Sequence, residues 1–213
     1  MTFQNGVEII GESSFWGTAL IEVVIPSSVK RLEYRAFSGY DDGKHNTTLQ
    51  KVVLNEGLES IGDYCFRCND GLREVVIPSS VKSIGNCAFD ECRNLSRVTL
   101  QEGLQSIGDW CFYSTNLPEV IVPRSVQNIG RDAFSSNVVF SRPADYHSEG
   151  VLTPNMVREQ LSKMQGEKVF VVPEGIKIIY FGCFMNSDVE RVTLPSSVKE
   201  IRWGAFNNCK KLR

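Results

Sequence analysis

Residues 72–89 read LREVVIPSSVKSIGNCAF, and closely similar stretches recur along almost the whole chain. The copies at 20–37 and 49–66 read LIEVVIPSSVKRLEYRAF and LQKVVLNEGLESIGDYCF, and further copies begin at residues 95, 117, 168 and 189. The phenylalanine that ends each copy recurs every 22 or 23 residues, apart from two longer intervals of 29 and 50 residues. Self-similarity at a period of roughly 20–29 residues predicts a solenoid, in which each repeat forms one coil and stacks on its neighbours.

The pattern L-x-x-V-x-[IL]-P-x-S-V-x-x-I-x-x-x-A-F resembles the BspA-type leucine-rich repeat, and seven copies keep the same phase. The resemblance implies a right-handed leucine-rich repeat solenoid, with one parallel β-sheet on its concave side and short turns or helical turns on its convex side. It also implies a surface or secreted protein of adhesion and recognition, whose partner is a host or cell-surface protein. No catalytic motif and no cofactor come with the resemblance.

We expect residues 1–213 to form a single solenoid of about eight repeats, the first and the last incomplete. The two longer intervals predict insertions at residues 38–48 and 137–167. Each incomplete end leaves a coil uncovered, and uncovered strand edges favour pairing with another chain. End-to-end self-association is therefore a further hypothesis.

The composition excludes several classes of function. A net charge of −2 and a pI of about 5.8 leave no electrostatic footprint for nucleic acid. No apolar run approaches the roughly 18 residues of a membrane span. The first 15 residues lack a basic segment followed by an apolar one, so we expect no secretory signal within this chain.

Within each coil, residues alternate between the two sides of the strand, so that Val75 and Ile77 are predicted to point inward. The proline and serine that follow end the strand, and Gly85 is expected to let the backbone bend. The residue before the closing phenylalanine is only ever alanine or cysteine, which indicates a small buried slot. The slot residues are Ala36, Cys65, Ala88, Cys111, Ala133, Cys183 and Ala205.

The residues predicted to point outward from the strands form two columns across the sheet. The first column is β-branched, and the second alternates in charge over five successive strands. Both columns suit a sheet for its own sake, and both could equally line a partner site. The candidate partner-binding residues are Glu22, Val24, Lys51, Val53, Glu74, Val76, Arg97, Thr99, Glu119, Ile121, Arg191 and Thr193.

The second insertion departs from the repeat. Thr153 followed by Pro154 is typical of a helix start, and Val157 and Leu161 then share one face. We expect a helix at about 154–165 on the convex side, covering the core that a normal coil would fill. The loop at 141–152 is a secondary contact candidate through Arg142, Asp145, Tyr146 and His147.

Metal binding and catalysis find little support. The spacing of Cys65, Cys68, Cys87 and Cys92 superficially resembles a zinc site, but the repeat phase explains two of these residues without a metal. A disulfide between Cys68 and Cys92 stays open; otherwise we expect reduced thiols. His45 lies in the first insertion beside two aspartates, with no further ligand in range. We therefore predict no metal, no cofactor and no enzyme activity.

The favoured reading is a protein-recognition scaffold that binds an unidentified protein ligand on the concave sheet face. The alternative is a structural spacer segment of a larger surface protein or assembly. The two differ in whether the outward residues can change without loss of any interaction.

Overall fold

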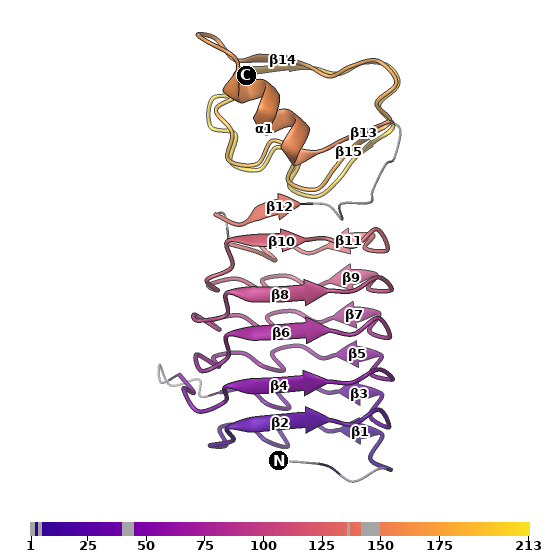
Figure 1. The fold of residues 1–213 in the computed structure, drawn as a ribbon, viewed down its shortest axis with the longest axis vertical. Helices are drawn as coiled ribbons and strands as arrows, with labels where there is room; N and C mark the ends of the chain where they lie inside the picture. Colours follow the sequence, from indigo (N-terminus) through magenta and orange to yellow (C-terminus); the bar gives the residue numbers. More distant parts are fainter. Residues whose placement is uncertain (1–2, 4–5, 40–44, 136, 142–149) are drawn as a thin grey trace. The chain divides into compact units, whose positions relative to one another are not determined.

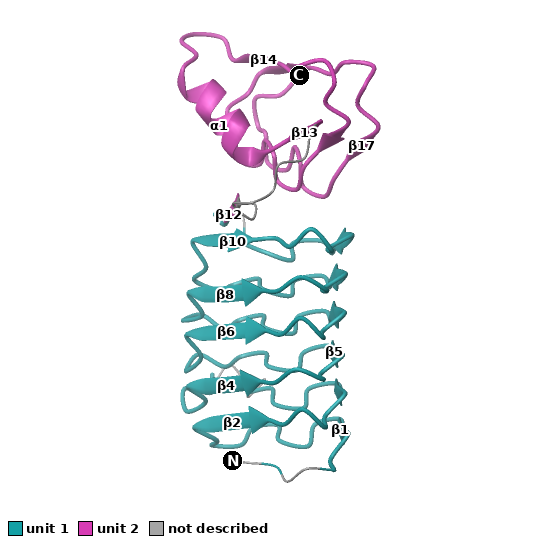
Figure 2. Cartoon of the chain, turned by 45° about the vertical axis from the view of Figure 1, so that its right-hand side comes forward, with its two compact units in different colours: residues 1–138 teal, residues 139–213 magenta. Residues whose placement is uncertain are grey.

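The computed structural model describes residues 3, 6–39, 45–135, 137–141 and 150–213. The chain divides into two compact units, Met1–Val138 and Val139–Arg213 (Figure 2). Both are parallel-strand solenoids, and within the described residues they have about eight turns and one helix, which confirms the predicted fold class.

In the first unit, five coils carry a long strand of three or four residues. Valine, isoleucine and leucine dominate these strands, and β-branched residues favour a pleated, half-buried surface. Buried and outward residues alternate along each strand, as the sequence predicts. The long strands are β2 (Glu22–Ile25), β4 (Lys51–Leu54), β6 (Glu74–Ile77), β8 (Arg97–Leu100) and β10 (Glu119–Ile121).

A second parallel sheet, which we did not predict from the repeat pattern, runs beside the long strands (Figure 1). Its strands have two residues each and pair without interruption across six coils, ending on the V-x-x-I isoleucine or an equivalent leucine. They are β1 (Ile9–Ile10), β3 (Arg31–Leu32), β5 (Ser60–Ile61), β7 (Ser83–Ile84), β9 (Ser106–Ile107) and β11 (Asn128–Ile129). The segment after each turn, which was expected only to return the chain to the core, thus forms a short β-strand in a sheet of its own.

The closing phenylalanines form a continuous aromatic stack through the first unit. Neighbouring rings lie nearly parallel, with centroids 5.1 to 5.4 Å apart. The alanine or cysteine before each ring from Phe37 onward is fully buried, as the small slot predicts, whereas Phe15 follows the exposed Ser14. Burial of each large apolar side chain contributes about 1.5–3 kcal/mol, so stacking of coils is the main stabilising term. The stacked residues are Phe15, Phe37, Phe66, Phe89, Phe112 and Phe134.

Glycine recurs in the repeat for a different reason from the backbone bend that the sequence predicts. Gly85 does not have a left-handed φ, so no bend requires it. A Cβ atom there would lie 2.6 Å from the peptide nitrogen of Asp63 in the preceding coil. Gly108 meets the peptide nitrogen of Asn86 in the same way, also at 2.6 Å. Glycine therefore allows successive coils to approach closely at this position.

Two kinds of turn alternate in the coils after the long strands of the first unit. One contains proline and serine, and the other contains glutamate and a glycine with a positive φ of +107° or +113°. The first kind lies at 26–28, 78–80 and 123–125, and the second at 55–57 and 101–103.

The glutamates of the second kind clamp the next coil. Glu56 Oε1 accepts hydrogen bonds from the peptide N–H and the hydroxyl of Ser79, and its Oε2 accepts one from the peptide N–H of Ser80, all at 3.0 Å. Glu102 accepts from two peptide N–H groups of the turn at 123–125, at 3.0 and 3.1 Å. These clamps span the β4–β6 and β8–β10 junctions, where the long strands belong to different sheets. On the long-strand side, strand ladder and carboxylate clamp thus alternate from coil to coil, while the short strands pair at every junction.

The second unit contains the predicted helix. Its α1 spans Pro154–Ser162, and the Thr153 hydroxyl accepts the N-cap hydrogen bond from the Met156 amide. Val157 and Leu161 are buried in a core with Phe170 and Phe184, in place of a normal arc. The strands are β12 (Val139–Ser141), β13 (Val151–Leu152), β14 (Val169–Val171), β15 (Ile178–Ile179), β16 (Arg191–Thr193) and β17 (Glu200–Ile201).

Candidate partner-binding site

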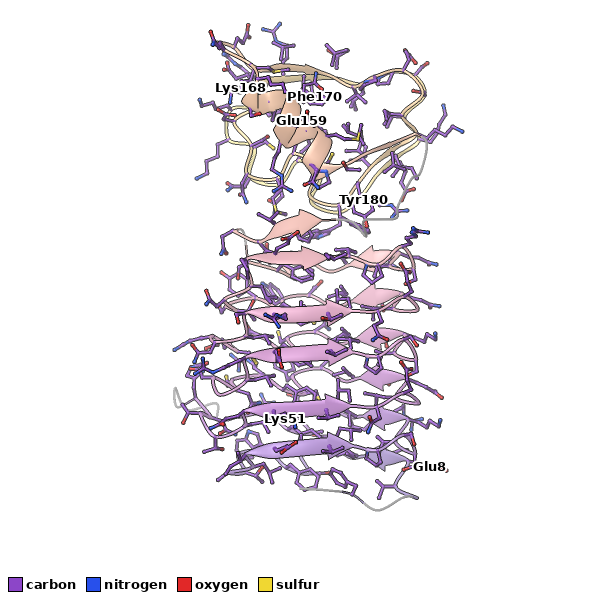
Figure 3. The ribbon with its side chains drawn as sticks, in the orientation of Figure 1. Glu8, Lys51, Glu159, Lys168, Phe170 and Tyr180 are labelled. Carbon is purple, nitrogen blue, oxygen red and sulfur yellow. The ribbon has the colours of Figure 1, made fainter. Side chains whose placement is uncertain are left out.

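The outward face of the long strands in the first unit is the candidate site. The strand backbone is held by ladder bonds and by the buried side chains beneath it, so each outward residue has a defined position. Val76 is 48% exposed and Ile121 is 50% exposed, so both present apolar surface on this face. Figure 3 shows Lys51 on this face.

The charged column pairs within the two strand ladders. Lys51 Nζ lies 2.7 Å from Glu22 Oε1 across β2 and β4, and Arg97 Nη1 lies 3.6 Å from Glu74 Oε2 across β6 and β8. The hydrogen bond and the positive charge of Lys51 lower the pKa of Glu22 below its ordinary value. These pairs are largely exposed, so their contribution to stability is small.

A groove of about 630 Å³ opens on this face between the two ladders. It lies where β4 and β6 belong to different sheets, the junction that the Glu56 carboxylate spans. Its outward lining combines the apolar side chains of Val53 and Val76 with charged and polar ones. Its outward lining consists of Gln50, Lys51, Val53, Arg73, Glu74, Val76, Arg97 and Thr99.

The groove brings together six of the residues predicted from sequence: Lys51, Val53, Glu74, Val76, Arg97 and Thr99. Glu22, Val24, Glu119 and Ile121 lie on the same strand face but outside the groove lining. Arg191 and Thr193 are exposed on β16 of the second unit, where Arg191 Nη2 contacts Glu167 Oε1 at 2.6 Å. The secondary loop candidates Arg142, Asp145, Tyr146 and His147 lie outside the described residues.

Sequence reasoning missed Gln50 and Arg73, which line the groove from positions just before β4 and β6. Their repeat position immediately precedes the charged column, and it also holds Ile21, Ser96 and Pro118. Within the first unit, a comparison of this position would have shown long polar side chains only before β4 and β6, the two strands that bound the groove.

No helix in the described parts of the chain has the length and apolar character that a membrane crossing requires.

The chain was compared with known families and proteins. A model of the BspA type leucine-rich repeat region matches residues 8–140 and 161–213, with six copies. No curated protein sequence matches.

Several solved structures share the fold. The pneumococcal vaccine antigen PcpA matches with a TM-score of 0.61 and 20% identity over 97% of this chain, which spans only 55% of that protein. The leucine-rich repeat protein TpLRR of T. pallidum has a TM-score of 0.57 and 22% identity, covering 96% of this chain and 82% of that one. A leucine-rich repeat protein of Bacteroides ovatus has a TM-score of 0.51 and 17% identity, covering 100% of this chain and 70% of that one. At these identities the likeness is one of fold.

Proposed function

Because this chain belongs to the BspA-type leucine-rich repeat family, we propose that it is a non-catalytic scaffold that binds a protein partner in the groove between β4 and β6. The family is typical of surface and adhesion proteins, and such scaffolds are generally not enzymes. The single observation that carries the proposal is the groove, which gathers six outward residues from three strands.

Binding here would work by preorganisation. The groove residues stand on strands fixed by the stacked core, so little conformational entropy is lost when a partner orders them. Val53 and Val76 offer apolar contact, and Lys51, Glu74 and Arg97 offer charges of both signs. A partner that places an apolar side chain between an acidic and a basic group would complement this arrangement.

The spacer function is the second candidate, and the ion pairs favour it. Glu22 with Lys51, and Glu74 with Arg97, already neutralise one another on the face. The same ion pairs would be expected if the charged column only stabilised the sheet and bound no partner.

A charge-exchange experiment separates the two candidates. The double variant Glu74→Lys with Arg97→Glu reverses two groove charges and keeps their pairing. The matched control exchanges Arg31→Glu with Glu33→Arg, an exposed pair 3.1 Å apart on the short-strand side of the same unit. Proteins retained by wild type and by each variant from surface extracts of candidate partner cells would be quantified by mass spectrometry.

We expect a partner that wild type and the control variant retain and that the groove variant loses, with all three proteins equally folded by circular dichroism. A partner retained equally by all three proteins would place binding elsewhere. If no protein is retained above background, the spacer function replaces the recognition function.

A further inference from the structure

His45, Cys68 and Glu91 meet at one point on the first unit. Cys68 and Glu91 take the same repeat position in two successive coils, 23 residues apart, and His45 comes from the first insertion, 23 residues before Cys68. One donor atom from each residue, an imidazole nitrogen, the Cys68 sulfur and a Glu91 carboxylate oxygen, lie within 4.8 Å of one another. Nitrogen, thiolate and carboxylate together form a donor set typical of Zn²⁺.

The backbone next to His45 is tied to the coils. The Asn46 peptide N–H donates to the Cys68 carbonyl at 2.9 Å, and the Asn46 side-chain amide donates to the Thr18 carbonyl at 3.1 Å. The Asn46 Oδ1 accepts from both the peptide N–H and the hydroxyl of Thr48, at 2.9 and 2.7 Å. This end of the insertion therefore places the imidazole beside the coils, as preorganised metal sites require.

Both imidazole nitrogens face carboxylates. Nε2 of His45 lies 3.4 Å from Glu91 Oε2, and Nδ1 lies 3.4 Å from Asp70 Oδ1. The histidine side chain is only 11% exposed, and its buried Nδ1 makes no hydrogen bond. At about 2.0–2.2 Å from a tetrahedral zinc ion, a nitrogen and an oxygen ligand stand about 3.3–3.6 Å apart. The spacing between Nε2 and Oε2 is therefore that of two ligands of one ion.

Asp70 and Arg67, which lie outside the cluster of three donor atoms, also fit a metal ion at this point. Asp70 faces the other histidine nitrogen, where metal-binding histidines usually have a carboxylate partner that orients the ring. Arg67 Nη2 donates to Glu91 Oε1 at 2.6 Å, and Oε2, which accepts from Arg93 Nη2 at 3.2 Å, lies on the side of His45. Arg67 also contacts Asp90 through Nε at 3.0 Å.

The charged side chains around the three donor atoms have a net negative charge that a dication would balance. Asp70, Asp90 and Glu91 are acidic, and Arg67 and Arg93 contact Glu91 or Asp90 with positive charge. With Cys68 as thiolate, acidic groups exceed basic groups by two, which one Zn²⁺ would neutralise.

Cys68 and Glu91 occupy equivalent positions of two successive coils. Both are in the left-handed region, with φ of +60° and +56°, two residues after the stacked phenylalanine. Ser114, Asn186 and Asn208 take the same position with φ of +52° to +58°, so the conformation belongs to the repeat. The two side chains therefore leave their coils from matching backbone positions.

We propose that His45 Nε2, Cys68 Sγ and the Glu91 carboxylate bind one Zn²⁺ ion, with Asp70 as the outer partner of His45 Nδ1. The fourth tetrahedral position is left for water. The ion would clip the first insertion to two successive coils. The site differs from the four-cysteine set suggested by spacing, because Cys92 is fully buried with its thiol directed to the Phe66 carbonyl at 3.1 Å.

The test uses the full chain, stripped of metal with a chelator and kept reduced. Co²⁺ is titrated in place of zinc, because a cobalt–thiolate bond gives a charge-transfer absorption band in the near ultraviolet. Zinc stoichiometry is measured by native mass spectrometry, and zinc affinity by competition with a chromophoric chelator. The variants are Cys68→Ser, His45→Gln and Asp70→Asn, and Cys209→Ser is the control thiol at the half-buried cysteine of the second unit.

We expect one zinc ion per chain, and a cobalt–thiolate band that Cys68→Ser abolishes and Cys209→Ser leaves intact. Asp70→Asn should weaken zinc binding by about 10–100-fold, and His45→Gln by more than about 100-fold. His45 is outside the repeat core, so this variant decides the matter even if Cys68→Ser fails to fold. The proposal is overturned by the absence of a thiolate band, by a band that survives in Cys68→Ser, or by zinc affinity unchanged in His45→Gln.

Discussion

The residue type that a repeat position accepts depends mainly on the atoms of the preceding coil that lie next to it. Gly85 illustrates this, because its missing side chain is the space into which the Asp63 peptide fits. Gly11 follows an isoleucine at the end of a short strand in the same way, yet the nearest atom to a Cβ there would be Ser14 Oγ at an ordinary 3.5 Å. The same repeat position thus differs in its steric demand between two coils.

The substitution Gly85→Ala should therefore lower the free energy of unfolding by about 1–3 kcal/mol, since an added methyl group must push two backbones apart. The matched substitution Gly11→Ala should be neutral or stabilise the protein by up to about 1 kcal/mol, through the less flexible unfolded chain. Urea denaturation of both variants measures the difference. Equal effects of the two substitutions would contradict the close-approach explanation.

The sequence predicts toward which side of the strand each side chain points, but it does not predict which outward side chains gather in one groove. The alternation of Val75, Val76 and Ile77 follows from the two-residue period of a strand. Nothing in that period says that Val76 joins a groove while Ile121 stays outside its lining, because this depends on which neighbouring strands pair.

On the side of the long strands, neighbouring coils of the first unit are joined by two different kinds of interaction in turn. Hydrogen-bonded ladders join β2 to β4 and β6 to β8, and glutamate clamps join the coils between these pairs. The Glu56 carboxylate has a lowered pKa, chiefly because the Ser79 peptide N–H donates to its charged form. A carboxylate whose pKa is lowered by folding stabilises the folded state above its unfolded pKa, and this stabilisation is lost as the pH falls through the folded pKa.

The substitution Glu56→Gln should therefore destabilise the protein at pH 7, and the difference from wild type should shrink toward zero as the pH falls below the lowered pKa. Chemical denaturation across this pH range measures both proteins. The control Glu59→Gln removes an exposed carboxylate from the same coil and should have little effect at any pH. A Glu56→Gln penalty that is independent of pH would show that charge is not what the clamp uses.

Helix α1 replaces an arc of the repeat with one buried face. The substitution Leu161→Ala should cost about 2–5 kcal/mol, because it removes a side chain that is 5% exposed from a packed core. Met156→Ala on the exposed side of the helix should change stability by less than about 0.5 kcal/mol. Thermal or urea unfolding compares the two. Similar losses would mean that the helix does not fill the gap in the core.

The helix was predictable and the short-strand sheet was not, for a physical reason. A threonine cap, a proline at the first turn and a spacing of four between buried residues are local signals of a helix. A two-residue strand has no period of its own, and it exists only because the same two positions in the next coil lie beside it.

At the scale of the whole molecule, the regular repeat predicts that residues 1–213 form one solenoid. Stacked coils stabilise one another, so we expect one cooperative unfolding transition. Variants that keep only Trp110 or only Trp203 report on the first or the second unit by fluorescence. Coincident urea midpoints are expected, and two well-separated midpoints would indicate independent domains.

The period of the sequence was sufficient for the fold class and for the outward face, whereas the proposed zinc site needed the structure. His45 lies in an insertion, so its place in the stack does not follow from repeat phase. The 23-residue spacing to Cys68 and from there to Glu91 was the available signal, and it gains meaning only when the insertion is seen to return to the coils at Asn46.

The alternating turns have a consequence for how such a chain can grow. A duplication that copied one coil would set two proline–serine turns, or two glutamate–glycine turns, side by side, and one junction would lose its complementary partner. Copying two coils at once, about 45 residues, preserves every junction. The structural module of the first unit is therefore a pair of coils, and a designer who lengthens or shortens this unit should add or remove coils two at a time.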